Sequence, residues 1–171
     1  MNGLSVSSGA FLMQASVPED LVGMPAEGDG DWAAWHGVTW ADVDGRNAIV
    51  LVSITMTPFR QGQGRQEQGT SAADVLTARI RARRPGRDAH VGRFATAGGH
   101  PGVSVRRVVT QRVGGRNVTT GQAQAFVAYP DAEALGVVSG VALDPADLDR
   151  ATELVTGIAA GMTITSAPAA A

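Results

Sequence analysis

Runs of apolar and β-branched residues, some alternating with polar residues and some continuous, predict a chain built mainly of short strands. Apolar and polar positions alternate in residues 35–43, whereas residues 47–57 are apolar over most of their length, which is typical of a buried strand. The pattern predicts strands at 10–17, 35–43, 47–57, 91–95, 103–113, 117–129 and 135–143.

Two of the connections between these strands contain dipeptides that are typical of tight hairpin turns. Asp44-Gly45 follows the second predicted strand, and Gly114-Gly115 follows the fifth. Both dipeptides suit the positive backbone angles of a two-residue hairpin turn, so we expect two antiparallel hairpins. The segments rich in turn-forming residues are expected to connect elements without regular structure. They are residues 24–31, 60–69 and 98–102.

Two other segments carry the signals of helix ends. Ser71 with Asp74 three positions later fits a capping box, and the helical spacing that follows predicts a helix over 72–84. Asp144 and the proline after it open a second helix over 145–161, because aspartate is a good N-cap and proline suits the first helical position. The buried stripe of this second helix is expected to consist of Leu148, Ala151, Val155, Ile158 and Met162.

The order of the elements indicates an α+β fold rather than an alternating α/β fold. With 171 residues, of which 44% are apolar, the chain fits one globular domain. We expect residues 1–165 to form this domain as an antiparallel sheet of about six to seven strands, covered by the mid-chain helix and the C-terminal helix. Residues 166–171 are expected to be a flexible tail. Gly136 and Gly140, inside an apolar strand, indicate bulges or points of close approach.

Two missing residue types narrow the chemistry. The chain has no cysteine, which excludes thiolate nucleophiles and thiolate metal sites, and no lysine, which excludes Schiff-base chemistry. A G-x-x-x-x-G segment carries Thr70 where a phosphate-binding loop has its lysine. The histidines His36, His90 and His100 lack the spacing of a metal site, and Ser139 is displaced by one position from a G-x-S-x-G elbow. We predict neither an enzyme nor a bound metal or cofactor.

The pattern also argues against a membrane segment. No apolar run approaches the roughly 18 residues that a membrane helix needs. Residues 1–20 lack the basic start and the apolar stretch of a secretion signal. The expectation is a cytoplasmic protein without membrane insertion.

Charge is strongly segregated along the chain. Residues 1–44 hold seven acids and no arginine, a net charge of −7, and residues 117–171 hold six acids and one arginine, a net charge of −5. Residues 45–116 hold thirteen arginines and three acids, a net charge of +10. The densest group of arginines, at 79–93, is either a patch for phosphate or an acidic partner, or a solvated face neutralised by the acidic segments. Both interpretations stay open.

The tryptophans are also clustered, because all three lie within nine residues. Tryptophan anchors many interfaces, although it also builds cores. The alternation in 35–43 puts Trp35 and Trp40 on opposite faces of one strand, so at least one of them should face away from the main core or lie under a helix. The residues expected to contact a partner are Trp32, Trp35, Trp40, Arg79, Arg81, Arg83, Arg84 and Arg87.

The order of elements resembles that of the PsbP-like superfamily, which includes DcrB-type bacterial proteins and related actinobacterial lipoproteins. The resemblance covers nearly the whole chain: a first strand ending in Val17-Pro18-Glu19, a hairpin with tryptophans, a mid-chain helix, a meander closed by Gly114-Gly115, and a terminal helix before Met162-Thr163-Ile164. It implies an antiparallel sheet covered by helices and a non-enzymatic role in binding or assisting another protein, including chaperone-like roles in secretion. This chain lacks the lipidated cysteine of the lipoprotein members, and no functional residue carries over.

The leading hypothesis is therefore a non-enzymatic protein-interaction module, such as an adaptor or a secretion-associated chaperone. It would use the tryptophan hairpin and the arginine-rich segment as contact surfaces. The alternative is binding of nucleic acid or a phosphorylated ligand through the arginines of 79–93, with an affinity that falls steeply with salt. A third hypothesis is a small enzyme that uses Asp42, Asp44 or His36, which has only the presence of these residues in its favour.

Overall fold

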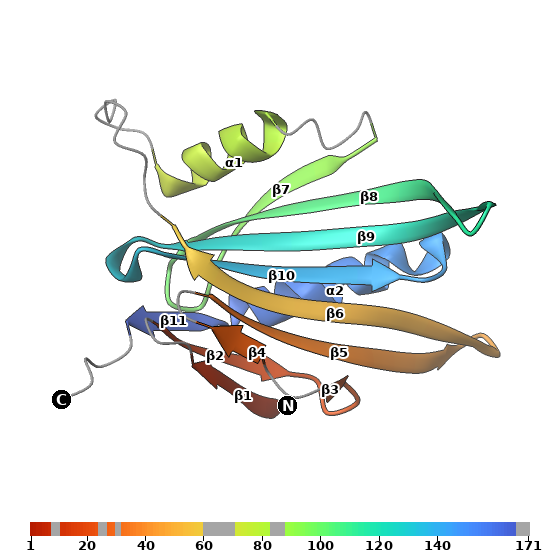
Figure 1. Cartoon of the computed structure of the whole chain (residues 1–171), viewed down its shortest axis with the longest axis horizontal. Coiled ribbons are helices and arrows are strands. Elements are labelled where there is room, and N and C mark those ends of the chain that lie inside the picture. The colour runs from red at the N-terminus through yellow and green to blue at the C-terminus, as the bar shows by residue number, and fades with distance from the viewer. Residues whose placement is uncertain (8–10, 24–26, 30–31, 60–70, 83–87, 167–171) are drawn as a thin grey trace.

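The computed structural model describes residues 1–7, 11–23, 27–29, 32–59, 71–82 and 88–166. Its fold is α+β, as the sequence predicts, with two antiparallel sheets and two α-helices (Figure 1). The main sheet has the order β3 (Val22–Gly23), β5 (Trp32–Val43), β6 (Arg46–Pro58), β10 (Ala134–Ala142), β9 (Arg116–Tyr129), β8 (Pro101–Val113) and β7 (His90–Ala95), and β4 (Glu27–Asp29) also pairs with β5. The smaller sheet has the order β1 (Asn2–Ser7), β2 (Phe11–Val17) and β11 (Thr163–Ser166). The helices are α1 (Ala72–Ala82) and α2 (Leu148–Ala160).

The two faces of the main sheet carry different layers. In β6, Val50, Val52 and Ile54 are buried on the face that packs against the smaller sheet and α2, here called the core face. The residues between them, such as Leu51 and Ser53, point to the opposite face, here called the outer face. Helix α1 packs on the outer face near β8, and α2 lies behind the strands in Figure 1. Both helices cover the sheet, as expected, and the structure places them on opposite faces.

Helix α2 buries the stripe that its spacing predicts. Ala151, Val155, Ile158 and Met162 are buried, and Leu148 is half-buried. At the end of this helix the Tyr129 hydroxyl donates a hydrogen bond to the Met162 carbonyl oxygen, over 2.6 Å. Burial raises the pKa of Tyr129, so the phenol stays protonated and keeps this bond. The bond fixes the point at which the chain leaves α2 for β11.

The glycines of β10 are explained by side chains that pack closely against the strand, and not by a bulge. The strand pairs with β6 and β9 in continuous register. A Cβ atom at Gly136 would lie 2.3 Å from Met162 Cε, and one at Gly140 would lie 2.7 Å from Val155 Cγ2. Both distances are too short for real contacts, so the helical layer sits against the strand backbone at these two positions.

Both predicted hairpins are confirmed. Strand β5 pairs with β6, and β8 pairs with β9, each in continuous antiparallel register. The turn residues have positive φ at both central positions: 52° at Asp44, 79° at Gly45, 56° at Gly114 and 81° at Gly115. A tight turn of this hand requires such angles, which is why Asp-Gly and Gly-Gly occur here.

The sequence pattern misses four short strands: β1, β3, β4 and β11. The expectation of no regular structure in 24–31 is wrong for Glu27–Asp29, because β4 pairs there with the edge of β5. The same expectation for 98–102 is wrong at its end, because Pro101 and Gly102 pair with β7. Residues such as Glu, Gly, Asp and Pro have low strand propensity, and pairing with a neighbour overrides it.

The helix predictions hold with shifted ends. Helix α1 ends at Ala82 in the described part of the chain, so residues 83–84 of the predicted helix lie outside the described residues, as do residues 60–69. The second predicted helix begins with a 3₁₀ turn over Pro145–Asp147 before α2 starts. The carboxylate of Asp144 accepts a hydrogen bond from the Ala146 N–H at 2.8 Å, which confirms its capping role. Strand β11 ends at Ser166, and residues 167–171 are not described.

An ion pair joins the start of β6 to the start of α2. Arg46 donates from Nη1 and Nη2 to the two carboxylate oxygens of Asp147, at 2.7 and 2.6 Å. The Asp147 side chain is buried, whereas Arg46 is partly exposed. The hydrogen bonds from Arg46 hold the pKa of Asp147 below its ordinary value of 3.8, although desolvation opposes this shift.

We expect acid to weaken the fold through this carboxylate. Because the pKa of Asp147 is lower in the folded chain than in the unfolded one, its stabilising contribution is complete above about pH 4 and is lost as pH falls through the lowered pKa. Urea titrations should show that Asp147→Asn lowers stability at neutral pH and flattens its dependence on pH below about pH 4. The control is Glu153→Gln, at an exposed carboxylate on α2. The same acid dependence in wild type and Asp147→Asn would contradict the prediction.

Candidate binding face

The outer face of the main sheet is covered unevenly. Helix α1 packs against β8 and β9, near one side of the sheet. Over β5, β6 and the part of β10 beyond Leu135, most outward side chains are half-buried or exposed, and no described helix packs on them. The exposed fraction reaches 46% at Leu51 and 54% at Trp40. Large apolar side chains left exposed side by side are typical of interaction surfaces.

Helix α1 is held in place by its N-terminal cap and by its apolar side chains. Ser71 Oγ accepts from the Asp74 N–H at 3.2 Å, and Asp74 Oδ2 accepts from the Ser71 N–H at 3.3 Å. This reciprocal pair is the predicted capping box. Leu76 and Ile80 then pack into a second apolar cluster with Phe59 and with residues of β8 and β9. Arg93 of β7 donates to Asp74 at 2.8 Å and ties the helix to the sheet edge.

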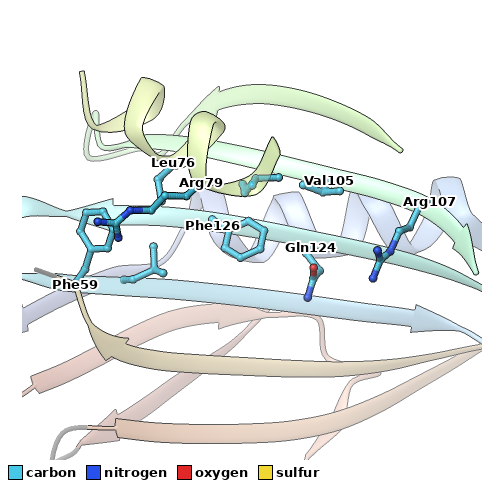
Figure 2. Close-up of a pocket in the computed structure, with 9 residues that line it drawn as sticks. Phe59, Leu76, Arg79, Val105, Arg107, Gln124 and Phe126 are labelled. Carbon is cyan, nitrogen blue, oxygen red and sulfur yellow. The ribbon is translucent and has the colours of Figure 1, made fainter. Parts of the chain in front are cut away.

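A cavity of about 340 Å³ lies between α1 and the sheet. Figure 2 shows side chains of the sheet and of α1 lining it from both sides. Most of its lining is apolar, and three side chains add polar groups. The apolar residues are Phe59, Leu76, Ile80, Val105, Phe126 and Leu135, and the polar ones are Arg79, Arg107 and Gln124. A mostly apolar hollow with a few polar groups is the usual chemistry of a binding site.

The polar groups of this cavity are cations and donors. The Arg79 guanidinium lies over the Phe59 ring, 5.0 Å from its centroid, in a cation–π contact. Among the described residues no acidic side chain pairs with Arg79. Arg107 donates to Gln122 Oε1, at 3.1 Å from Nη2 and 3.3 Å from Nε. The cavity is therefore suited to an apolar group that carries a negative charge.

A second hollow, of about 270 Å³, lies on the same face over β5, β6 and β10. Its lining includes His36, Leu51, Ser53 and Val141. Ser139 also lines it and accepts a hydrogen bond from the Gln124 amide at 3.2 Å, and Gln124 lines the first cavity. The two hollows thus adjoin across the Gln124–Ser139 pair and form one continuous surface. This surface, from the cavity under α1 to the outer face of β5, is here called the binding face.

Acidic side chains are few on this face. Strands β6, β8, β9 and β10 contain no acidic residue, and β5 contains Asp42 at its far end. Asp42 Oδ1 accepts a hydrogen bond from the Gly45 N–H at 2.8 Å and so belongs to the hairpin turn. The binding face is therefore uncharged over β6 and β10, where apolar side chains alternate with Ser and Thr, and it has arginines along one border.

The structure places Trp35 and Trp40 on opposite faces of β5, as the alternation predicts. Trp35 is buried on the core face, with 6% of its surface exposed, so it is a core residue. Trp40 is exposed, on the same side of β5 as His36. Trp32 begins β5, and its side chain lies outside the described residues. Of the three, Trp40 is the one that the structure places on an exposed surface.

The predicted arginine sites are described in part. Arg79 and Arg81 are exposed on α1, whereas Arg83, Arg84 and Arg87 lie outside the described residues. Elsewhere the acidic ends of the chain neutralise part of the basic middle: Arg106 pairs with Asp149, and Arg46 with Asp147. Within the arginine-rich segment, the described Arg93 pairs with Asp74, an acid of the basic middle of the chain.

The sequence pattern misses much of the binding face. The pattern predicts Gln124, Phe126 and Leu51 only as parts of strands. A signal for this face is present in residues 122–126, where two glutamines and one phenylalanine alternate with the buried Ala123 and Ala125. Such a strand covers a core on one side and leaves a half-polar surface on the other.

No group of three or more His, Asp or Glu side chains in the described ranges is arranged to hold a metal ion. Within the same ranges, no helix is long and apolar enough to cross a membrane.

Comparisons of the chain with protein-family models, curated proteins and solved structures gave no match. The PsbP-like resemblance therefore stays a prediction.

Proposed function

We propose that this chain is a protein-interaction module that binds a segment of a partner protein on the binding face. The observation that carries the proposal is the partly exposed and largely apolar surface over β5, β6 and β10, which adjoins the cavity under α1. The absence of acids from β6, β8, β9 and β10 and the position of Arg79 favour a partner with negative charge. An adaptor or a secretion-associated chaperone would have such a surface.

The test compares the tagged full-length chain with two matched variants. Leu51→Glu places a charge in the centre of the binding face, while Val108→Glu places one at a position of similar exposure, 49%, on the opposite side of the sheet. We expect a partner captured by the wild type to be lost from Leu51→Glu and retained by Val108→Glu. Both variants should unfold at urea concentrations close to that of the wild type, since both positions are exposed.

Each capture is made at physiological and at several-fold higher ionic strength, and protein and nucleic acid are identified separately. Equal recovery of the partner by both variants would contradict the proposed face. Recovery of nucleic acid alone, in an amount that falls with salt, would favour the alternative function through the arginine-rich segment.

A further inference from the structure

We infer that the partner segment bound on the binding face is an amphipathic α-helix with an acidic side chain near one end. This inference rests on the proposed function and adds the conformation and charge of the segment. It follows from the hydrogen bonding of the strands, the width of the uncovered surface and the position of Arg79.

The first argument concerns backbone hydrogen bonds. Strand β6 pairs with β5 on one side and β10 on the other, and β10 pairs with β6 and β9. Their backbone donors and acceptors are therefore occupied within the sheet. An extended segment laid on this face would leave its own N–H and C=O groups without partners against apolar side chains, which is costly. A helix forms these bonds within itself.

The second argument concerns size. Neighbouring strands lie about 4.8 Å apart, so the strands β5, β6 and β10, on whose outer face no described helix packs, span about 10 Å between the outer two. A helix with its side chains is about 10 Å across, and helices pack at about 8–10 Å from one another. One helix therefore fits beside α1. From Leu135 to Val141 the strand extends about 20 Å, which matches about 13 helical residues.

The third argument concerns the side chains that such a helix would meet. Leu135, Val137 and Val141 lie on the outer face of β10, with Ser139 between the two valines, and Val141 pairs with Leu51 of β6. Leu51 in turn pairs with Val38 of β5. A polar row of Ser139, Ser53 and His36 crosses this otherwise apolar strip. The strip suits a helix with apolar residues at every third or fourth position and a polar residue where it crosses that row.

The charge of the helix follows from Arg79. Its guanidinium stacks on Phe59, which comes directly after β6, so the cation lies at one end of the apolar strip. Figure 2 shows the Arg79 side chain reaching from α1 towards this ring. A guanidinium stacked on an aromatic ring keeps its N–H edge available for a carboxylate. An Asp or Glu near one end of the bound helix would form this pair.

The experiment selects ligands from a displayed library of random 15-residue peptides. The full chain is the target, and the Leu51→Glu chain removes peptides that bind elsewhere. Enriched sequences are then synthesised, and their affinity and circular dichroism are measured with and without the protein. We expect apolar residues at helical spacing, an acidic residue near one end, a gain of helicity on binding, and at least about tenfold weaker binding to Leu51→Glu.

The charged contact has its own matched pair of variants. Arg79→Gln should weaken binding by about tenfold, an expected change of about 1.4 kcal/mol, whereas Arg81→Gln on the same helix should leave affinity unchanged. Replacing the acidic residue of the peptide by arginine should abolish binding to the wild type and restore it to Arg79→Glu. Equal effects of the two glutamine variants would overturn the assigned contact.

The results of the peptide selection can overturn the helical partner without overturning the proposed function. Peptides that depend on Leu51 but alternate apolar and polar residues, or that stay non-helical when bound, would overturn the helix and leave the proposed function standing. A library that yields no peptide dependent on Leu51 would overturn both.

Discussion

Trp35→Ala is expected to lower the free energy of unfolding by about 4 kcal/mol, the loss typical of a buried tryptophan. The Trp35 ring is buried and lies across two glycines that face each other on β3 and β5. A Cβ atom at Gly23 would lie 2.2 Å from the ring, and one at Gly37 would lie 2.5 Å from it. Removing the ring would therefore leave a cavity that these backbones fill only in part.

The matched control is Trp40→Ala on the same strand. Trp40 is exposed, so its removal should change stability by less than about 1 kcal/mol. Urea denaturation followed by far-ultraviolet circular dichroism measures both variants without relying on the fluorescence of the residue replaced. Similar losses at the two positions would contradict the assignment of one tryptophan to the core and the other to the surface.

Gly140→Val is expected to lower stability by about 3 kcal/mol, at the upper end of the usual cost of overpacking. The added Cβ would lie 2.7 Å from Val155 Cγ2 and 3.5 Å from the Ala151 carbonyl oxygen. Val155 is stiff because it is β-branched, so the strain passes to the helix backbone. At Gly136 the nearest atom is the end of Met162, which is flexible, and Gly136→Ala should cost less.

Two measurements show whether contact with α2 is the cause. Adding Val155→Ala to Gly140→Val should recover part of the loss, so that the double variant is more stable than the sum of the single effects. Gly157→Ala, in the same helix but with no atom within 4 Å of the added Cβ, should instead stabilise the chain by about 0.5–1 kcal/mol. Additive effects of the first pair would contradict the proposed clash.

The proposed function places the contact with a partner on one face of the main sheet. Charge segregation and clustered tryptophans first suggested two contact surfaces, the tryptophan hairpin and the arginine-rich segment. In the described part of the fold, Trp40 and Arg79 belong to the same side of the main sheet, with an apolar surface between α1 and β5. The two predicted surfaces thus become parts of one proposed binding face.

Several elements could be predicted from the sequence because local rules fix them. The hairpin turns need positive φ at two successive positions, which Asp44-Gly45 and Gly114-Gly115 provide. The start of α1 follows from the reciprocal bonds of Ser71 and Asp74, and the buried stripe of α2 follows from helical periodicity. Each of these signals lies within a few residues of the structure it predicts.

What the sequence determined by itself was the α+β class, both hairpins, both helices and the opposite facing of Trp35 and Trp40. The tertiary structure alone decided which tryptophan is buried, that β1, β2 and β11 form a separate sheet, and that β4 pairs with β5. It also decided the ionic partners of the arginines, such as Arg46 and Asp147, 101 residues apart. The binding face belongs to this second group. Alternation shows that a strand has two faces, but which face is covered depends on elements distant in the chain.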